Sequence, residues 1–232
     1  MTFISALILA GMFYATEPIA KTSEAVFNKR AILAAVKTHL PKKLDEMSDQ
    51  EVLALFEEKM DQRVLNMKGE LVDGIKAEKV DMAQEKKKPV EDRLLPFYVY
   101  AGDDGKKFYI LSVRGSGLWD EIWGNVALEE DLRTLAGASF DHKGETPGLG
   151  AEIKDNPAFS AQFLGKTIYD QTGEFTSVVV RKGGAKDPAN EVDGISGATI
   201  TCNGVTEMLD RGIQYYQPYL DKLKADKQTG MK

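Results

Sequence analysis

The stretch "RLLPFYVYAGDDGKKFYILSV", from Arg93 to Val113, decides the fold class of this chain. It holds two runs rich in aromatic and β-branched residues, separated by Asp103-Asp104-Gly105. Runs of this kind favour strands, and an Asp-Gly step between them favours a tight hairpin turn. The stretch therefore predicts two antiparallel strands that are neighbours both in sequence and in space.

Further strands follow in the C-terminal direction. "EIWGNVALEEDLRTLAGASFDH", residues 121–142, predicts a second hairpin, and "GEFTSVVVRKGG", residues 173–184, predicts one more strand. Between them, "NPAFSAQFLG" predicts a short helix, because Pro157 occupies the favoured first helical position. On the N-terminal side, "RVLNMKGELVDG" predicts two short strands around Lys68-Gly69.

Helices are expected at both ends of the chain. A helix capped by Thr22 and stopped by Pro41 would carry Phe27 on its apolar stripe. "SDQE", from Ser48 to Glu51, is a capping-box signature that opens a second helix ending near Met60. At the other end, one helix is expected from Ile200 to about Tyr215 and a separate polar helix from Pro218.

Strands in hairpins with helices at the ends predict an α+β fold, an antiparallel sheet with flanking helices, rather than repeated βαβ units. Three parts are expected: a membrane helix at 1–20, a helical lead-in with a charged excursion at 21–93, and a C-terminal domain at 94–232. Eleven of the eighteen residues at 76–93 are charged. That segment is interpreted as solvated and partly helical, with an acidic partner as the alternative.

The composition excludes several classes of protein. A net charge of −6 argues against a nucleic-acid binder, which would carry a basic surface. Cys202 is the single cysteine, so no internal disulfide can form, and no Cys/His spacing suits a metal site.

The N-terminus "MTFISALILAGMFYAT" has no charged side chain before Glu17. It is shorter than the roughly 20 residues that a spanning helix needs. It also lacks the basic start and the small-residue cleavage site of a signal peptide. We interpret it as a membrane helix, with a signal-peptide remnant or a buried core helix as alternatives.

Three glycine-containing segments could carry chemistry. "DGISGAT", from Asp193 to Thr199, leads into the C-terminal helix, so it could cradle a phosphate at the helix N-terminus or simply form a turn and cap. "HKGETPGLGAEI", from His142 to Ile153, could lie against a planar ligand or form a wide turn. "GSGLWDEIWG" contains both tryptophans: Trp119 could cover a ring system or lie in the core, whereas core packing is favoured for Trp123.

Nucleophilic catalysis finds little support in the sequence. A reactive Ser or Thr needs a base within hydrogen-bond reach, and His142 is the one plausible base. Cys202 is expected to be a small buried residue rather than a thiolate nucleophile. No catalytic residue and no metal site is therefore expected.

Taken together, the three segments resemble the FMN-binding domain family. "DGISGAT" is similar to the family's flavinylation motif, in which FMN is joined by a phosphoester bond to the last Thr, here Thr199. "HKGETPGLGAEI" is similar to its second signature loop, which borders the isoalloxazine ring. "GLW", from Gly117 to Trp119, and the layout of the chain resemble the branch formed by the C subunits of sodium-pumping NADH:quinone oxidoreductases.

The resemblance implies which residues hold the cofactor. Thr199 would be the covalent attachment point, while Ser196 and Thr201 would shape or cap the turn around it. The other implied FMN-binding residues are Leu118, Trp119, Glu145, Thr146, Gly148, Leu149, Asp193, Gly197 and Ala198. A tethered flavin stays at high local concentration even in a shallow, exposed pocket, which suits electron exchange with neighbouring subunits.

The resemblance further implies a membrane-anchored electron-transfer subunit with covalent FMN, in a complex that oxidises NADH, reduces quinone and pumps sodium. The chain is not expected to turn over alone. Its expected partners are the other subunits, a flavin transferase and the membrane, with no nucleic acid. The expected location is the bacterial inner membrane, with a single pass and the flavin domain facing the periplasm.

Three alternatives remain open from the sequence. The first is the G subunit of an Rnf-type ferredoxin:NAD oxidoreductase, which is similar in both flavin motifs. The second is a stand-alone flavin reductase. The third is a non-redox membrane-tethered adaptor in which "DGISGAT" is only a turn and a cap.

Overall fold

The computed structural model of the chain describes Glu17 and residues 22–230. The expected membrane helix at 1–20 lies outside the described residues, apart from Glu17. Within the described ranges, no helix is both long enough and apolar enough to cross a membrane.

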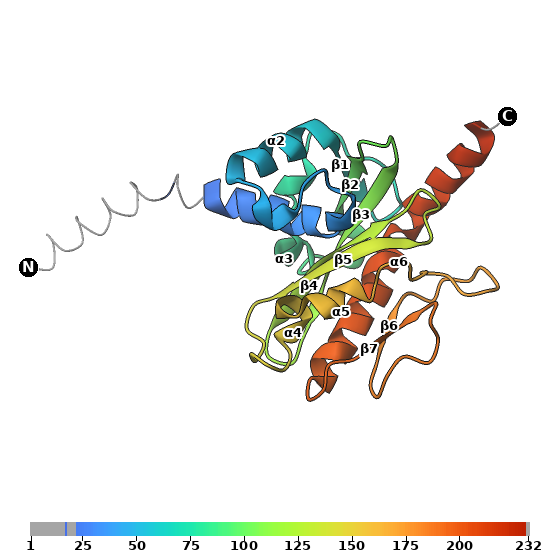
Figure 1. Cartoon of the computed structure of the whole chain (residues 1–232). Helices are drawn as coiled ribbons and strands as arrows, with labels where there is room; N and C mark the ends of the chain where they lie inside the picture. The colour runs from blue at the N-terminus through green and yellow to red at the C-terminus, as the bar shows by residue number, and fades with distance from the viewer. Residues whose placement is uncertain (1–16, 18–21, 231–232) are drawn as a thin grey trace, which may run out of the picture.

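The centre of the fold is a five-stranded antiparallel sheet in which each strand pairs with the next along the chain (Figure 1). Both predicted hairpins are present, and Gly105 takes a positive φ of 81° in the turn of the first. The expected α+β class with an antiparallel sheet is confirmed. The strands are β1 (Met60–Asn66), β2 (Leu94–Ala101), β3 (Lys107–Ser116), β4 (Glu121–Leu128) and β5 (Leu135–His142).

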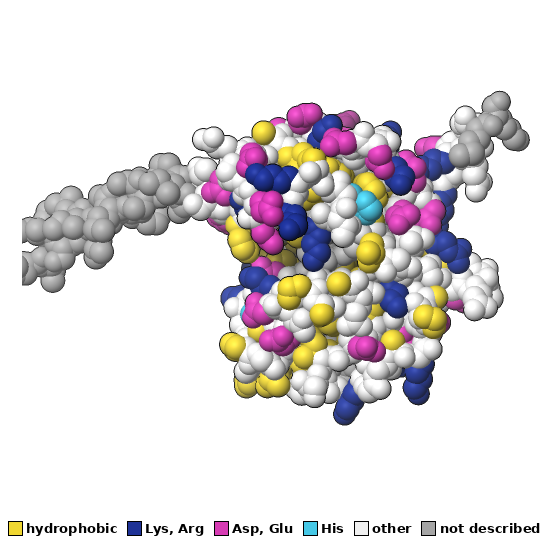
Figure 2. Space-filling model, in the orientation of Figure 1, with side chains coloured by type: hydrophobic (Ala, Val, Ile, Leu, Met, Phe, Trp, Pro, Cys, Tyr) yellow, Lys and Arg dark blue, Asp and Glu magenta, His cyan; other side chains and the backbone are white. Residues whose placement is uncertain are grey.

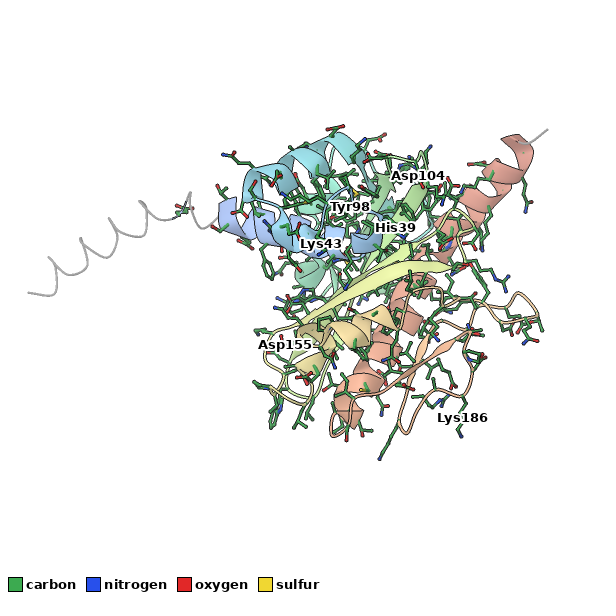
Figure 3. All side chains as sticks on the ribbon, in the orientation of Figure 1. His39, Lys43, Tyr98, Asp104, Asp155 and Lys186 are labelled. Atoms are coloured by element: carbon green, nitrogen blue, oxygen red, sulfur yellow. The ribbon has the colours of Figure 1, made fainter. Side chains whose placement is uncertain are left out.

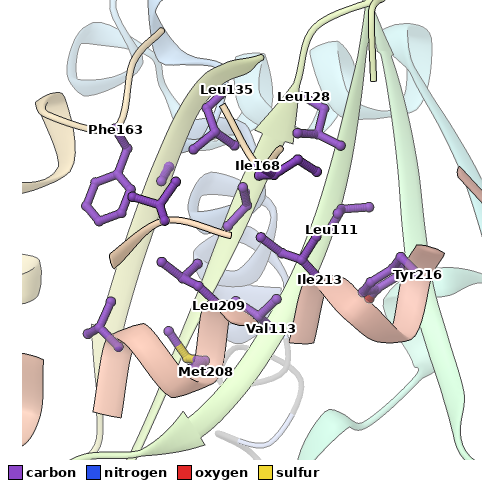
Figure 4. Packing of buried hydrophobic residues seen from close by; sticks show 14 of the residues in the cluster. Leu111, Val113, Leu128, Leu135, Phe163, Ile168, Met208, Leu209, Ile213 and Tyr216 are labelled. Atoms are coloured by element: carbon purple, nitrogen blue, oxygen red, sulfur yellow. The ribbon is translucent and has the colours of Figure 1, made fainter. Parts of the chain in front are cut away.

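Both faces of this sheet are covered, so successive residues of a strand enter different cores. In β3, Leu111 and Val113 face helix α6 (Thr199–Gly230), whereas Ile110 faces the lead-in helices. Figure 4 shows Leu209, Ile213 and other apolar side chains of α6 packed against this side of the sheet. Burial on both faces explains why β2 reads as an almost continuous apolar run.

The N-terminal part of the chain packs on the opposite face. It contains a helix at 22–34, two 3₁₀ turns, η1 (Lys37–His39) and η2 (Leu44–Glu46), and helix α2 (Asp49–Lys59). The predicted capping box is present: the Ser48 amide donates to Glu51 Oε2 (2.6 Å), and the Glu51 amide donates to Ser48 Oγ (3.2 Å). His39, Lys43 and Tyr98 mark this upper half of the molecule in Figure 3.

The first helix ends at residue 34, earlier than the predicted stop before Pro41. The Ala31 carbonyl accepts from the side chains of Asn125 (3.2 Å) and Ser139 (2.8 Å), and the Ala35 amide turns to Ile32 instead (3.2 Å). Sheet side chains therefore terminate this helix. Phe27 was expected on its apolar stripe but is 48% exposed.

The lead-in also contributes β1, which pairs with β2, so the expected boundary at residue 93 falls between two paired strands. The second strand expected after Gly69 is reduced to one bridge between Leu65 and Leu71. The charged excursion is partly helical, as expected. Its turns are η3 (Ala77–Lys79), α3 (Met82–Glu85) and η4 (Val90–Asp92).

Short elements connect β5 to α6. They are α4 (Glu152–Asp155), α5 (Pro157–Ala161), β6 (Val179–Arg181) and β7 (Glu191–Asp193). Pro157 is the first residue of α5, as predicted, and Asn156 caps it. The parallel pairing of β6 with β7 was not predicted. Helix α6 also differs from expectation, because it continues through Pro218 without a break.

Candidate functional site

The "DGISGAT" segment forms a tight turn between β7 and the first turn of α6. Gly197 has a φ of +79°, in the left-handed region that favours glycine. Thr199 is the first residue of α6 and is half-buried, whereas Ser196 is exposed and Ala198 is buried. Amides in the first turn of a helix have no partner within the helix, so the turn presents donors and a positive dipole end.

Thr199 lies in the wall of an open groove of about 520 Å³. The turn and the start of α6 form one side of this groove, and Lys182, Gly183 and Gly184 form the other. Asp193 also lines this groove, and its Oδ1 accepts the Ala185 amide (2.6 Å), which holds the loop after Lys182 beside the turn. A neighbouring hollow of about 370 Å³ includes Gly148 and Ser196.

One buried carboxylate joins all three segments. Glu145 is 5% exposed. Its Oε1 accepts the backbone amide of Trp119 (2.9 Å), and its Oε2 accepts the hydroxyl of Thr201 (2.5 Å). The structure therefore brings the "GLW" segment, the second signature loop and the start of α6 together.

Large apolar side chains are exposed around this junction. Trp119 is 69% exposed, and its indole Nε1–H donates to Thr146 Oγ1 (3.0 Å). Leu118 (46%), Leu149 (40%) and Ile200 (57%) are exposed as well. The loops that precede α4 lie at the lower left of Figure 1, and Figure 2 shows hydrophobic side chains gathered on the surface there. Such a patch on a protein surface is typical of a binding site.

The two tryptophans differ from each other in their surroundings. Trp119, for which core and surface were equally open, lies on the surface. Trp123 was expected in the core but is only partly buried. Its ring lies under the Arg114 guanidinium, 5.0 Å from the ring centroid, on the sheet face opposite α6. The alternation of β4 sends Ile122 into the core instead.

Thr201 was expected to shape or cap the turn, but it is 1% exposed and donates inward to Glu145. The expectation that Cys202 is buried is confirmed. Burial raises the pKa of its thiol, although the hydrogen bond from the Ile195 amide to Sγ acts in the opposite direction. His142 is no free base, because its Nδ1 accepts the Glu145 amide (3.1 Å).

Sequence reasoning missed the loop that faces Thr199 across the groove. Its signal was the adjacent pair Gly183-Gly184 after a strand, where both residues take positive φ. Lys182 precedes the pair, and Figure 3 labels Lys186 in the same loop, in the lower half of the molecule. This loop adds positive charge beside the first turn of α6.

The sequence model of the FMN-binding domain family matches residues 117–214. The chain is 33% identical over 228 residues to the C subunit of the Na(+)-translocating NADH-quinone reductase of Pseudomonas aeruginosa, covering 89% of this chain and 85% of that protein. It is 32% identical over 244 residues to the corresponding protein of Neisseria meningitidis, covering 97% and 91%.

Solved structures agree with these sequence relatives. The crystal structure of the C subunit of this reductase from Parabacteroides distasonis superposes with a TM-score of 0.76 at 35% identity, covering 87% of this chain and 95% of that one. The structure of Shewanella oneidensis NqrC has a TM-score of 0.74 at 24% identity, which shows a shared fold, with coverage of 88% and 99%. The expectation of the C-subunit branch, rather than the Rnf-type G subunit, is confirmed.

Proposed function

The chain belongs to the family of C subunits of the Na(+)-translocating NADH-quinone reductases, and on that premise we propose that it is an electron-transfer subunit that carries FMN covalently on Thr199. When bound, FMN supplies the capacity to accept and release single electrons. The polypeptide attaches, orients and exposes this group.

The residues of the groove, together with the exposed apolar side chains around Glu145, fit FMN. Its phosphate would lie at the N-terminus of α6, a position that favours anions, with Lys182 on the opposite wall. The exposed faces of Trp119, Leu149 and Ile200 suit a flat, largely apolar ring system. The groove of about 520 Å³ lies within the usual size range of cofactor pockets.

The single observation that carries the proposal is the contrast between two threonines of the motif. Thr199 is half-exposed in the groove wall. Thr201, one half-turn later, is buried and its hydroxyl is engaged by Glu145. A bulky phosphoester can therefore form at Thr199 without displacing the core, whereas the same bond at Thr201 would require the first turn to open.

The remaining parts of the proposal rest on the sequence and on the relatives' names. The segment without charge before Glu17 supports a single-pass anchor in the bacterial inner membrane, with the flavin domain facing the periplasm. The relatives are subunits of a reductase, which supports partner subunits and a chain that does not turn over alone. A separate flavin transferase would attach the FMN.

The test is to coexpress the chain with its flavin transferase and to view an unstained denaturing gel under ultraviolet light. The wild-type band should fluoresce, and Thr199→Ala should be dark while retaining the wild-type far-ultraviolet circular dichroism. Thr201→Val, a variant of equal size at the buried position, should still fluoresce. A fluorescent Thr199→Ala band would refute attachment at Thr199, and a dark wild-type band beside an active transferase would refute covalent FMN altogether.

A further inference from the structure

Glu145 is a buried carboxylate, and both hydrogen bonds found for it among the described residues come from the candidate site. It lies between β5 and α4 and is 5% exposed. Each of its oxygens accepts one hydrogen bond, from the Trp119 amide and from the Thr201 hydroxyl. Among the described residues, no ion pair to it is found, so these neutral donors stabilise the carboxylate in place of a cation.

Two glycines, Gly117 and Gly150, leave space for the Glu145 carboxylate. A Cβ added at Gly117 would lie 2.5 Å from Glu145 Oε1. A Cβ at Gly150 would approach Glu145 Oε2 more closely than real Cβ contacts do, and would lie 2.6 Å from Thr201 Oγ1. Glycines in both signature segments therefore make room for the carboxyl group of one side chain.

Trp119 shows what this arrangement holds in place. Its side chain is 69% exposed, so core packing cannot fix the ring. Two hydrogen bonds to one loop do so instead: the backbone amide donates to Glu145 and the indole N–H donates to Thr146. An exposed aromatic residue held at two points is preorganised to cover a planar group. Its side chain is already ordered, so binding causes little further loss of conformational entropy.

We propose that Glu145 is a positioning residue: its carboxylate fixes Trp119 and the first turn of α6 relative to each other. The aromatic ring and the attachment residue are thereby set in one geometry before any ligand arrives. Thr201 is the link on the helix side, because it lies two residues after Thr199 in the same turn. That the positioned ligand is a flavin rests on the proposed function, whereas the positioning itself is a property of the polypeptide.

The test uses the full chain expressed without a flavin transferase, in a Trp123→Phe background that leaves Trp119 as the one tryptophan. The readouts are the near-ultraviolet circular dichroism of the indole and the decay of its fluorescence anisotropy. Glu145→Leu should lose most of the indole band and gain a fast local motion. Glu145→Gln should retain the wild-type signals, because its amide can accept from Trp119 and donate to Thr201.

Glu152→Leu is the matched control, since it removes a carboxylate from the adjacent helix α4 and should leave the Trp119 signals unchanged. If Glu145→Leu does not fold, Glu145→Ala replaces it, because that variant also removes the acceptor of the Trp119 amide and of the Thr201 hydroxyl. Trp119 signals that stay at the wild-type level in a folded Glu145→Leu or Glu145→Ala would overturn the proposal. A dark flavin gel would refute the proposed function and leave this result standing.

Discussion

At the scale of single residues, close backbone approach decides where the site forms. A Cβ at Gly204 of α6 would lie closer than 3.0 Å to the carbonyl oxygen of Ser116, the last residue of β3. The next residues are Gly117 to Trp119, so this contact brings the start of α6 beside the tryptophan. Glycine is required here because backbone, rather than a flexible side chain, stands opposite.

Gly204→Ala should therefore destabilise the protein, even though alanine is a better helix former than glycine by about 1 kcal/mol. Overpacking against fixed backbone costs about 1–3 kcal/mol, so the net loss should be visible as a lower urea midpoint. Gly230→Ala is the control, because its Cβ would meet open space in the same helix. Equal midpoints for the two variants would show that α6 can shift away from β3.

A second residue-scale prediction concerns Glu191, which organises the loop that faces Thr199. Its carboxylate accepts from the Arg181 guanidinium and from the Lys186 (2.7 Å) and Asp187 (3.2 Å) amides. These hydrogen bonds, the one from Arg181 foremost, lower its pKa from 4.5 to about 2. A lowered folded-state pKa stabilises the fold above the unfolded value, and this contribution is lost as the pH falls from 4.5 toward 2.

Glu191→Gln should thus be less stable than wild type at pH 7, and the difference should shrink as the pH approaches 2. Thermal unfolding across that range measures it. Glu174→Gln, in the neighbouring loop, is the comparison variant. A stability difference that is constant with pH would assign the effect to packing of the side chain rather than to its charge.

The sequence indicated correctly which segments lie together at the site. It did not indicate how the side chains of those segments are oriented. The resemblance named Trp119, Glu145 and Thr199 together, and the structure brings the three segments that hold them into contact. It did not reveal that Glu145 turns inward or that Thr201 is buried. Those facts depend on how closely α6 approaches β3, a distance set by contacts between segments remote in sequence.

At the scale of elements, helix α6 shows how tertiary packing can override a local breaker. Pro218 was expected to begin a new helix because proline removes a backbone donor and crowds the preceding turn. The helix continues because the apolar stripe continues: Tyr216, Tyr219 and Leu220 are all buried. Lys222 adds a bond from Nζ to the carbonyl of Gly69 (2.8 Å) beyond the proline.

Tyr216 attaches α6 to two strands at once. Its hydroxyl lies 2.9 Å from the carbonyl oxygens of Pro96 in β2 and Ser112 in β3, and the residue is 1% exposed. Tyr216→Phe should cost about 1–3 kcal/mol, because buried carbonyls lose their donor. Urea unfolding measures this loss, with Tyr215→Phe as control, since that half-buried hydroxyl accepts a long hydrogen bond from Arg93 (3.4 Å). Similar losses in both variants would contradict the assignment.

The elements that sequence patterns predicted are those with local signals. The two hairpins and the capping box at Ser48 are set by neighbours a few residues away. The pairing of β6 with β7 joins three-residue strands in parallel, and no short-range pattern marks it. Two such short strands pair because the tertiary packing of the surrounding segments places them side by side. A pattern read from a single sequence therefore cannot predict the pair.

At the scale of the whole molecule, the lead-in is part of the folded body that carries the site. Lys29 is 6% exposed and pairs with Glu57 (3.0 Å) and Glu78 (2.8 Å), which joins the first helix to α2 and to the charged excursion. Asn125 and Ser139 join the same helix to the sheet. The sequence suggested that the lead-in and the C-terminal domain are separate parts. The reason is that the hydrogen bonds that link them join residues up to 108 positions apart in the chain.

A single substitution in the sheet should weaken the packing of the first helix of the lead-in against the sheet. Asn125 is 7% exposed, donates to the Ala31 carbonyl (3.2 Å) and accepts from the Ser112 hydroxyl (2.7 Å). Asn125→Ala removes both bonds, at a cost of about 1–3 kcal/mol. Since every 1.4 kcal/mol is about a tenfold change in an equilibrium constant, amides at 22–34 should exchange with solvent roughly five- to a hundredfold faster.

Hydrogen exchange followed by mass spectrometry measures this region by region. Amides in the α6 half of the core should keep their wild-type rates, because that helix packs on the other face of the sheet. Asn28→Ala, an exposed change on the first helix itself, should leave the exchange at 22–34 nearly unaltered. If exchange instead rose equally in the lead-in and in α6, the two faces of the sheet would unfold as one unit, and the lead-in would be as much a part of the flavin domain as α6 is.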